Sequence, residues 1–219
     1  MNWFVPTLVV LTLTGFSLDG ISTVSFSVPQ AIAQTPPSVP GPTQRVALQG
    51  LGACGGTPIL LTALVPEELG KTTADRPSFW FYVPYGQDSG KSARFSLADR
   101  TGNVVYRLPK ISLPATPGVV EIQIPTTVSP LENQASYRWY FAINGCDPAM
   151  EVFGWVQKVK PTELNGISDG WFDQVTALGQ QLKQKSGDTT IRSAWKQLLG
   201  KMNFPPSSQP NVADQPIMP

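Results

Sequence analysis

The sequence predicts a mainly β protein: an antiparallel Ig-like β-sandwich followed by a C-terminal helical hairpin, α+β overall. Two observations lead to this class. Between residues 45 and 160, short runs of alternating apolar and polar residues are separated by turns rich in Pro and Gly, as in strands. After Pro161 the apolar residues recur with the period of a helix.

Seven runs carry the strand pattern, and that number is typical of a sandwich of two sheets. In the run SFWFYV both alternating faces are apolar, so Phe79, Phe81 and Val83 are expected to line the core between the sheets. Trp80 and Tyr82 then need another cover. The seven runs are 59–65, 78–83, 92–98, 103–108, 119–124, 136–143 and 151–159.

Two further runs show which side chains should meet in the core. Residues 120, 122 and 124 are apolar with Glu121 and Gln123 opposite them. In the run 136–143, Arg138 lies opposite a second apolar set. The two sets expected to face each other are Val120, Ile122 and Ile124, and Tyr137, Trp139, Phe141 and Ile143.

The hairpin is predicted to supply the cover for Trp80 and Tyr82, because its apolar stripe also needs a surface. Ser168 or Asp169 is expected to cap the first helix, and Asp188 or Thr189 the second. The apolar positions at helical spacing are Trp171, Phe172, Val175, Leu178, Leu182, Ile191, Trp195, Leu198 and Leu199.

The first 33 residues resemble a secretory signal peptide: an apolar run too short to span a bilayer, then Ala-Ile-Ala before Gln34. An uncleaved N-terminal anchor is the alternative. We expect a periplasmic or extracellular protein with no membrane span after cleavage. The expected segments are 1–33 signal peptide, 34–44 Pro-rich disordered linker, 45–160 β-sandwich, 161–204 docked hairpin and 205–219 disordered tail.

The charge and residue types exclude several classes of function. Without Asp19 in the leader, 16 basic and 14 acidic residues remain, unlike the concentrated basic face of a nucleic-acid binder. The chain has no histidine, the commonest general base and metal ligand. We therefore expect no metal, no cofactor and no enzymatic activity.

The stretch GISDG fits the pattern that presents a nucleophilic serine in some hydrolases. Without a preceding strand or a histidine base, Ser168 is better explained as a helix cap. Carboxylates in loops leave open a glycoside-processing pair. Asp99, Thr101 and Asn103 in the turn DRTGN could offer oxygens to calcium, but the turn lacks the further acidic ligands and the length of calcium loops, so a plain turn is the better explanation. The loop carboxylates are Glu67, Glu68, Asp75 and Asp147.

Several aromatic motifs, in order and spacing, closely resemble the cyanobacterial exported family of unknown function DUF928. They include RPSFWFYVPYG, ARFSLADRTGNVVY and ENQASYRWYFAINGCDP, and the resemblance extends over about residues 45–204. It implies an exported β-domain with paired cysteines. It implies no catalytic residues.

The leading hypothesis is an exported, non-catalytic binding or structural module that contacts other envelope or extracellular proteins through loops or an edge strand. The loop PYGQDSGK offers Tyr85, Gln87 and Asp88 as a candidate contact surface. The alternative is a module that binds or processes carbohydrate, which exposed aromatic rings would favour.

Cys54 and Cys146 are predicted to form a disulfide, because exported chains meet an oxidising compartment. A metal or redox pair is the alternative, but the chain has no C-x-x-C motif. Non-reducing mass spectrometry of the exported protein should find no free thiol. Cys146→Ser should lower the unfolding midpoint, since a loop of this size contributes up to about 4 to 5 kcal/mol. Two thiols that react with an alkylating agent in the native protein would contradict the bridge.

Overall fold

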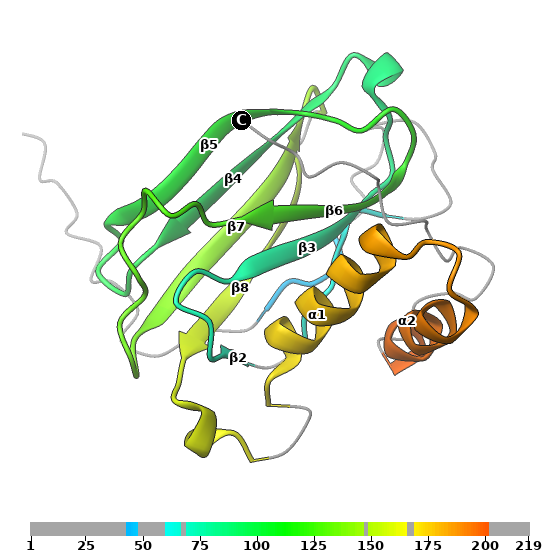
Figure 1. Ribbon diagram of the computed structural model, residues 1–219. Helices are drawn as coiled ribbons and strands as arrows, with labels where there is room; N and C mark the ends of the chain where they lie inside the picture. Colours follow the sequence, from blue (N-terminus) through cyan, green and yellow to red (C-terminus); the bar gives the residue numbers. More distant parts are fainter. Residues whose placement is uncertain (1–42, 48–59, 67–68, 147–148, 166–168, 202–219) are drawn as a thin grey trace, which may run out of the picture. The chain divides into compact units, whose positions relative to one another are not determined.

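The computed structural model describes residues 43–47, 60–66, 69–146, 149–165 and 169–201 (Figure 1). Within them, eight strands, two α-helices and two short 3-10 helices follow one another along the chain. The strands are β1 Thr62–Ala63, β2 Gly70–Thr72, β3 Ser78–Val83, β4 Ser92–Ala98, β5 Val104–Ser112, β6 Gly118–Gln123, β7 Ser136–Asn144 and β8 Met150–Lys158. The helices are η1 Gln87–Ser89, η2 Pro161–Glu163, α1 Trp171–Gln184 and α2 Thr189–Lys201.

The strands form two sheets, with orders β1-β3-β6 and β2-β8-β7-β4-β5. The prediction of a mainly β chain with two C-terminal helices is confirmed. The expectation of wholly antiparallel pairing is wrong at one place, because β2 pairs with β8 in parallel. Strand β2 is also absent from the predicted set, since the three residues GKT are too short to show an alternation.

The two sheets pack face to face through aromatic rings. The ring of Phe81 in β3 stacks on that of Phe141 in β7 with centroids 4.2 Å apart, and Phe79 lies 5.1 Å from Phe95 in β4. The inward sets predicted from alternation in β6 and β7 all belong to this core. The alternation of apolar and polar residues along these strands therefore predicted correctly which side chains lie between the sheets.

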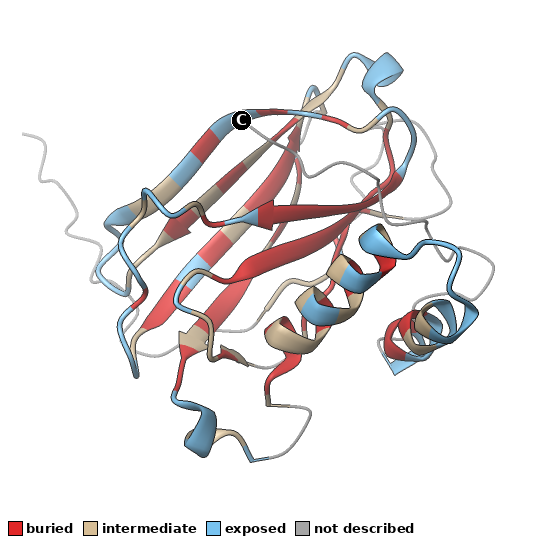
Figure 2. Ribbon diagram, in the orientation of Figure 1, coloured by how far each residue is buried: buried red, intermediate tan, exposed pale blue. Residues whose placement is uncertain are grey.

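The second face of β3 lies under the hairpin, as expected from its sequence. Trp80 and Tyr82 form a separate buried cluster with residues of α1 and α2, and Figure 2 shows β3 buried along its whole length. The indole of Trp80 donates to Thr176 Oγ1 at 3.1 Å and meets the ring of Trp195 edge-on at 6.1 Å. The hairpin is thus docked on the three-stranded sheet.

Polar contacts fix the position of α1 on this sheet. The side chain of Glu121 in β6 is only 6% exposed and accepts from Lys183 Nζ at 3.0 Å and from Gln180 Nε2 at 3.4 Å. In the first turn of α1, Asp173 accepts from the backbone N–H of Thr73 at 2.8 Å and from the hydroxyl groups of Thr72 and Thr73. These bonds tie both ends of α1 to the β-rich part of the chain.

The ends of the helices agree only in part with the sequence prediction. Ser168 lies outside the described residues, and the N-cap of α1 is Gly170, with no capping side chain. The Asp169 carboxylate instead accepts from the Asn165 N–H at 2.8 Å and from Lys71 at 3.1 Å. Asp188 does cap α2, accepting from the backbone N–H groups of Thr190 and Ile191. No helix of the described residues is long and apolar enough to cross a membrane.

A glycine in α1 tests the docking directly. A Cβ at Gly179 would lie 2.3 Å from Cη2 of Trp80, whose ring is itself buried. Gly→Ala within a helix ordinarily stabilises by up to about 1 kcal/mol, but overpacking costs about 1 to 3 kcal/mol. We expect Gly179→Ala to lower the free energy of unfolding by about 1 to 2 kcal/mol, measured by urea denaturation.

The matched control is Gly200→Ala in α2, where a Cβ meets no atom within 4 Å. Its stability should be unchanged or slightly higher. If Gly179→Ala proves as stable as the natural chain, α1 does not rest on Trp80.

Candidate binding surface

The predicted contact loop is only partly available to a partner. Gln87 and Asp88 are exposed on η1, but Tyr85 is 7% exposed and belongs to the core between the sheets. The Nζ of Lys91 lies 5.0 Å from the centre of the Tyr85 ring. This burial corrects the expectation that Tyr85 offers an exposed ring, and it removes the aromatic that suggested carbohydrate binding at this loop.

The predicted disulfide remains a prediction, because Cys54 lies outside the described residues. Cys146 follows β7 and is partly buried against the main core. Among the loop carboxylates, Glu67, Glu68 and Asp147 also lie outside the described residues.

The carboxylates of Asp75 and Asp99 have partners within the fold. Asp75 pairs with Lys158, whose hydrogen bond and charge hold the pKa of Asp75 below its ordinary value. In the turn DRTGN, Asp99 accepts from the N–H and hydroxyl of Thr101 and from Asn103. The bond from the Thr101 hydroxyl is the largest cause of the lowered pKa of Asp99. This geometry is that of a self-contained turn, and it offers no free carboxylate to calcium.

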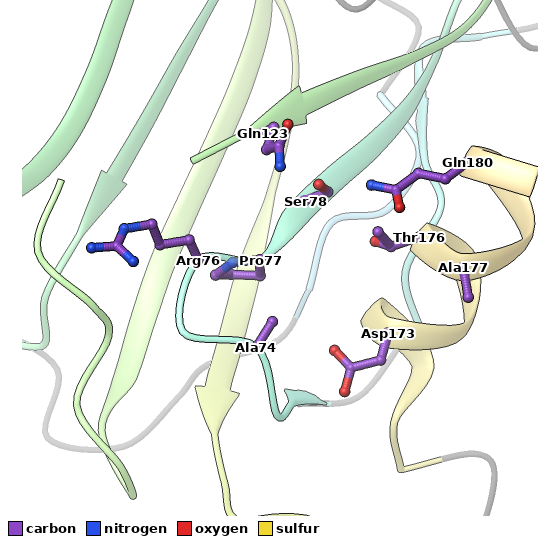
Figure 3. Close-up of a pocket in the computed structure, with 9 residues that line it drawn as sticks. All are labelled: Ala74, Arg76, Pro77, Ser78, Gln123, Asp173, Thr176, Ala177 and Gln180. Atoms are coloured by element: carbon purple, nitrogen blue, oxygen red, sulfur yellow. The ribbon is translucent and has the colours of Figure 1, made fainter. Parts of the chain in front are cut away.

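A hollow of about 290 Å³ lies where α1 meets the start of β3 and the end of β6 (Figure 3). Two of its polar groups already have partners: Asp173 binds Thr72 and Thr73, and Thr176 accepts from Trp80. Figure 3 shows the guanidinium of Arg76 directed away from α1, and its Nε donates to the carbonyl of Val128 at 2.8 Å. The hollow is therefore part of the interface between α1 and the three-stranded sheet.

The other large surface is the outer face of the five-stranded sheet. We define it by the side chains of β4, β7 and β8 that point away from the core, together with Arg107 of β5, which pairs with Ser96. Figure 1 shows the helices on the side of β3, away from this sheet. The members from β4, β7 and β8 are Ser92, Arg94, Ser96, Ala98, Arg138, Tyr140, Ala142, Asn144, Glu151, Phe153, Trp155 and Gln157. Ala142 and Trp155 among them are buried.

Hydrogen bonds join four of these side chains across three strands. The guanidinium of Arg94 donates to Tyr140 Oη at 3.0 Å and to Asn144 Oδ1, and it lies over the Tyr140 ring at 5.5 Å. The Tyr140 hydroxyl in turn donates to the Glu151 carboxylate. Burial, and then this bond to Glu151, raise the pKa of Tyr140 above its ordinary value, so the phenol stays protonated. The network holds the Arg94 guanidinium in one position on the face.

Two more arginines on this face are exposed to solvent. The guanidinium of Arg138 lies 5.2 Å from the centre of the Phe153 ring. Within the part of the chain that the structure describes, neither Arg107 nor Arg138 has a carboxylate partner. The carboxylate of Glu151 on the same face is bonded to Tyr140. The outer face therefore carries an excess of positive charge.

Strand register arranges these groups in rows across the sheet. One row runs Arg107, Ser96, Tyr140, Phe153, and the next runs Val104, Ala98, Arg138, Trp155. The sequence placed Arg138 opposite the core, but it gave no sign that Arg94, Tyr140 and Glu151 meet. Such contacts depend on which strands are neighbours in the sheet. The alternation of apolar and polar residues within one strand does not predict which strands these are.

A family model described as Domain of Unknown Function (DUF928) matches residues 41–166, more than half of the 219-residue chain. The chain belongs to this family. No curated protein and no solved structure matches the chain. The sequence resemblance to DUF928 is thus confirmed for the β-rich region.

The DUF928 match includes all of the described strands and ends before α1. Every residue of the outer face therefore lies inside the family domain. The helical hairpin lies C-terminal to the matched region. It nevertheless packs on the domain's three-stranded sheet and buries that sheet's second face.

Proposed function

We propose that this DUF928 protein is an exported, non-catalytic binding module of a cyanobacterial envelope, periplasmic or extracellular, that holds another component on its outer face. The observation that carries the proposal is the contrast between the two sheets. The hairpin covers one sheet, whereas the other presents Arg107 and Arg138 to solvent beside the hydrogen-bonded Arg94 network. The export part of the proposal rests on the leader-like residues 1–33.

We also propose that the two sheets form an Ig-like sandwich. We take β1, β3 and β6 as strands A, B and E, and β8, β7, β4 and β5 as strands G, F, C and C′. The three-stranded sheet then has the order A-B-E, and the five-stranded sheet has the order G-F-C-C′ with β2 added beside G. Near the start of β7, Tyr137 Oη accepts from the Glu132 N–H at 3.0 Å, as in the tyrosine corner of such domains. Two residues later, where antibody domains have a cysteine, Trp139 packs on Phe79 and Phe81.

The chemistry of the side chains supports a binding role over catalysis. The chain has no histidine, and two carboxylates that the fold partly or fully buries have structural partners: Glu121 pairs with Lys183, and Glu151 accepts from Tyr140.

A protein partner is one candidate, and it would contact the domain by its side chains. Pairing along the edge strand β5 is disfavoured, because Pro109 interrupts it, Arg107 and Lys110 are exposed on it, and two register shifts distort it. The exposed Gln87 and Asp88 on η1 remain available to a protein. A carbohydrate is the other candidate, favoured by the partly exposed rings of Tyr140 and Phe153 beside the arginines.

The test compares charge removal at two places on the same chain. Arg107→Ser with Arg138→Ser removes two charges from the outer face, and Lys196→Ser with Lys201→Ser removes two from exposed positions of α2. The mature protein is mixed with envelope and extracellular material of its own cells, and the retained fraction is measured. We expect the first variant to be retained roughly tenfold less, since hydrogen bonds to charged groups contribute about 1.5 to 3 kcal/mol, and the second to be retained normally.

Treating the material with protease beforehand separates the two candidates. Loss of retention after digestion indicates a protein partner, and unchanged retention indicates a polysaccharide. Equal retention of both variants, or no retention of the natural chain, would contradict a binding role for the outer face.

A further inference from the structure

We propose that the ligand of the outer face is an acidic polysaccharide, a chain of sugars that carry carboxylate or sulfate groups. This inference rests on the proposed binding function and adds the chemical class of the ligand. It follows from the charge of the face, its aromatic rings, the size of the side chains between them and the scarcity of exposed apolar groups.

The charge of the face selects an anion. Arg94, Arg107 and Arg138 contribute three positive charges, and Glu151 is their one carboxylate neighbour among the described residues of this face. A guanidinium offers planar paired donors that match carboxylate and sulfate oxygens. Two of the three guanidinium groups also lie over aromatic rings, which limits the freedom that they would lose on binding.

The rings and small residues between the arginines suit a sugar. Tyr140 and Phe153 are partly buried neighbours in one row of the sheet, each with a guanidinium group over its ring. The part of each ring that the guanidinium group leaves uncovered would contact the C–H groups of a pyranose. In the same row Ser96 lies between Arg107 and Tyr140. Its hydroxyl has no hydrogen-bond partner in the described part of the chain, and its small size lets a ring approach the sheet between the charged groups.

The face lacks the features of a protein interface. A protein interface usually has a central apolar cluster of well-packed anchors. Among the described residues, the large hydrophobic side chains that are exposed are Val46 and Val104, the latter 48% exposed. Only Val104 lies in a row of this face, at its β5 edge. A ligand that is polar, repetitive and anionic fits these properties better than a folded protein does.

The test uses the mature full-length protein and four soluble polymers of similar length. These are alginate, which bears a carboxylate on each sugar, dextran sulfate, neutral dextran and polyglutamate. Binding is measured by calorimetry at low and at physiological salt. We expect binding to alginate or dextran sulfate, none to neutral dextran, and at least tenfold weaker binding to polyglutamate than to the acidic polysaccharide, because it has no sugar ring.

Variants assign the binding to the outer face. Arg107→Ser with Arg138→Ser should weaken binding at least tenfold, and the matched Lys196→Ser with Lys201→Ser should leave it unchanged. Phe153→Ser removes a half-exposed ring and keeps all three arginines. It should weaken binding of the polysaccharide severalfold and leave that of polyglutamate unchanged. Circular dichroism and the unfolding midpoint of each variant verify that it is folded.

Two results would overturn the inference. Equal affinity for polyglutamate and acidic polysaccharide would show that charge alone is recognised, and an acidic protein segment would then be the better ligand. Failure to bind either acidic polysaccharide, while retention by native envelope material still depends on Arg107 and Arg138, would refute the ligand class and leave the proposed function intact. If that retention is also independent of the arginines, both proposals fail.

Discussion

The fold depends on strand β3, which is buried on both of its faces. Phe79 and Phe81 fill the space between the sheets, while Trp80 faces the helices. A fully buried side chain of this size contributes about 1.5 to 3 kcal/mol to the stability of the fold. Exposing one face of β3 to water would therefore lose this contribution for several side chains. The helices after the family domain are therefore needed to complete its cover. Because they occupy the three-stranded sheet, the other sheet keeps the open face.

The polar groups between α1 and the three-stranded sheet fix the position of the helix more than they add to the stability of the fold. Glu121 and Lys183 lose much of their hydration when they pair under α1, and such a loss offsets most of the attraction between them. Lys183 Nζ also lies 4.9 Å from the centre of the Trp80 ring. The pair thus fixes α1 over the indole that it has to cover. An apolar contact alone would allow the helix to slide, so the ion pair specifies one register.

Much of the fold could be predicted from local pattern, because burial in a two-layer protein follows the period of each element. Strands β3 and β4 have the predicted bounds, and the helical stripe does lie on Trp80 and Tyr82. The errors have physical causes. Strand β2 is too short to show a period, and its parallel pairing with β8 depends on tertiary contacts. Asp169 was expected to cap α1, but it binds Lys71 in a distant strand instead.

The candidate surface was less predictable than the fold. Tyr85 stands in a loop-like sequence two residues after β3, yet its ring enters the core. Arg94, Tyr140 and Glu151 come together only because β4 and β8 both flank β7. An alternating pattern says which side chains share a face of one strand. It does not say which strands lie side by side, and the chemistry of a sheet face depends on that order.

The most direct test of the central claim is removal of the cover from β3. Residues 165–219 would be deleted, and the unfolding midpoint and the binding of a hydrophobic dye compared with those of the full mature chain. The account predicts a β-domain that still folds but unfolds at a lower midpoint, binds the dye and tends to aggregate, since Trp80 and Tyr82 become exposed. A truncated domain with unchanged midpoint and no dye binding would contradict it, and the helices would then be an independent module.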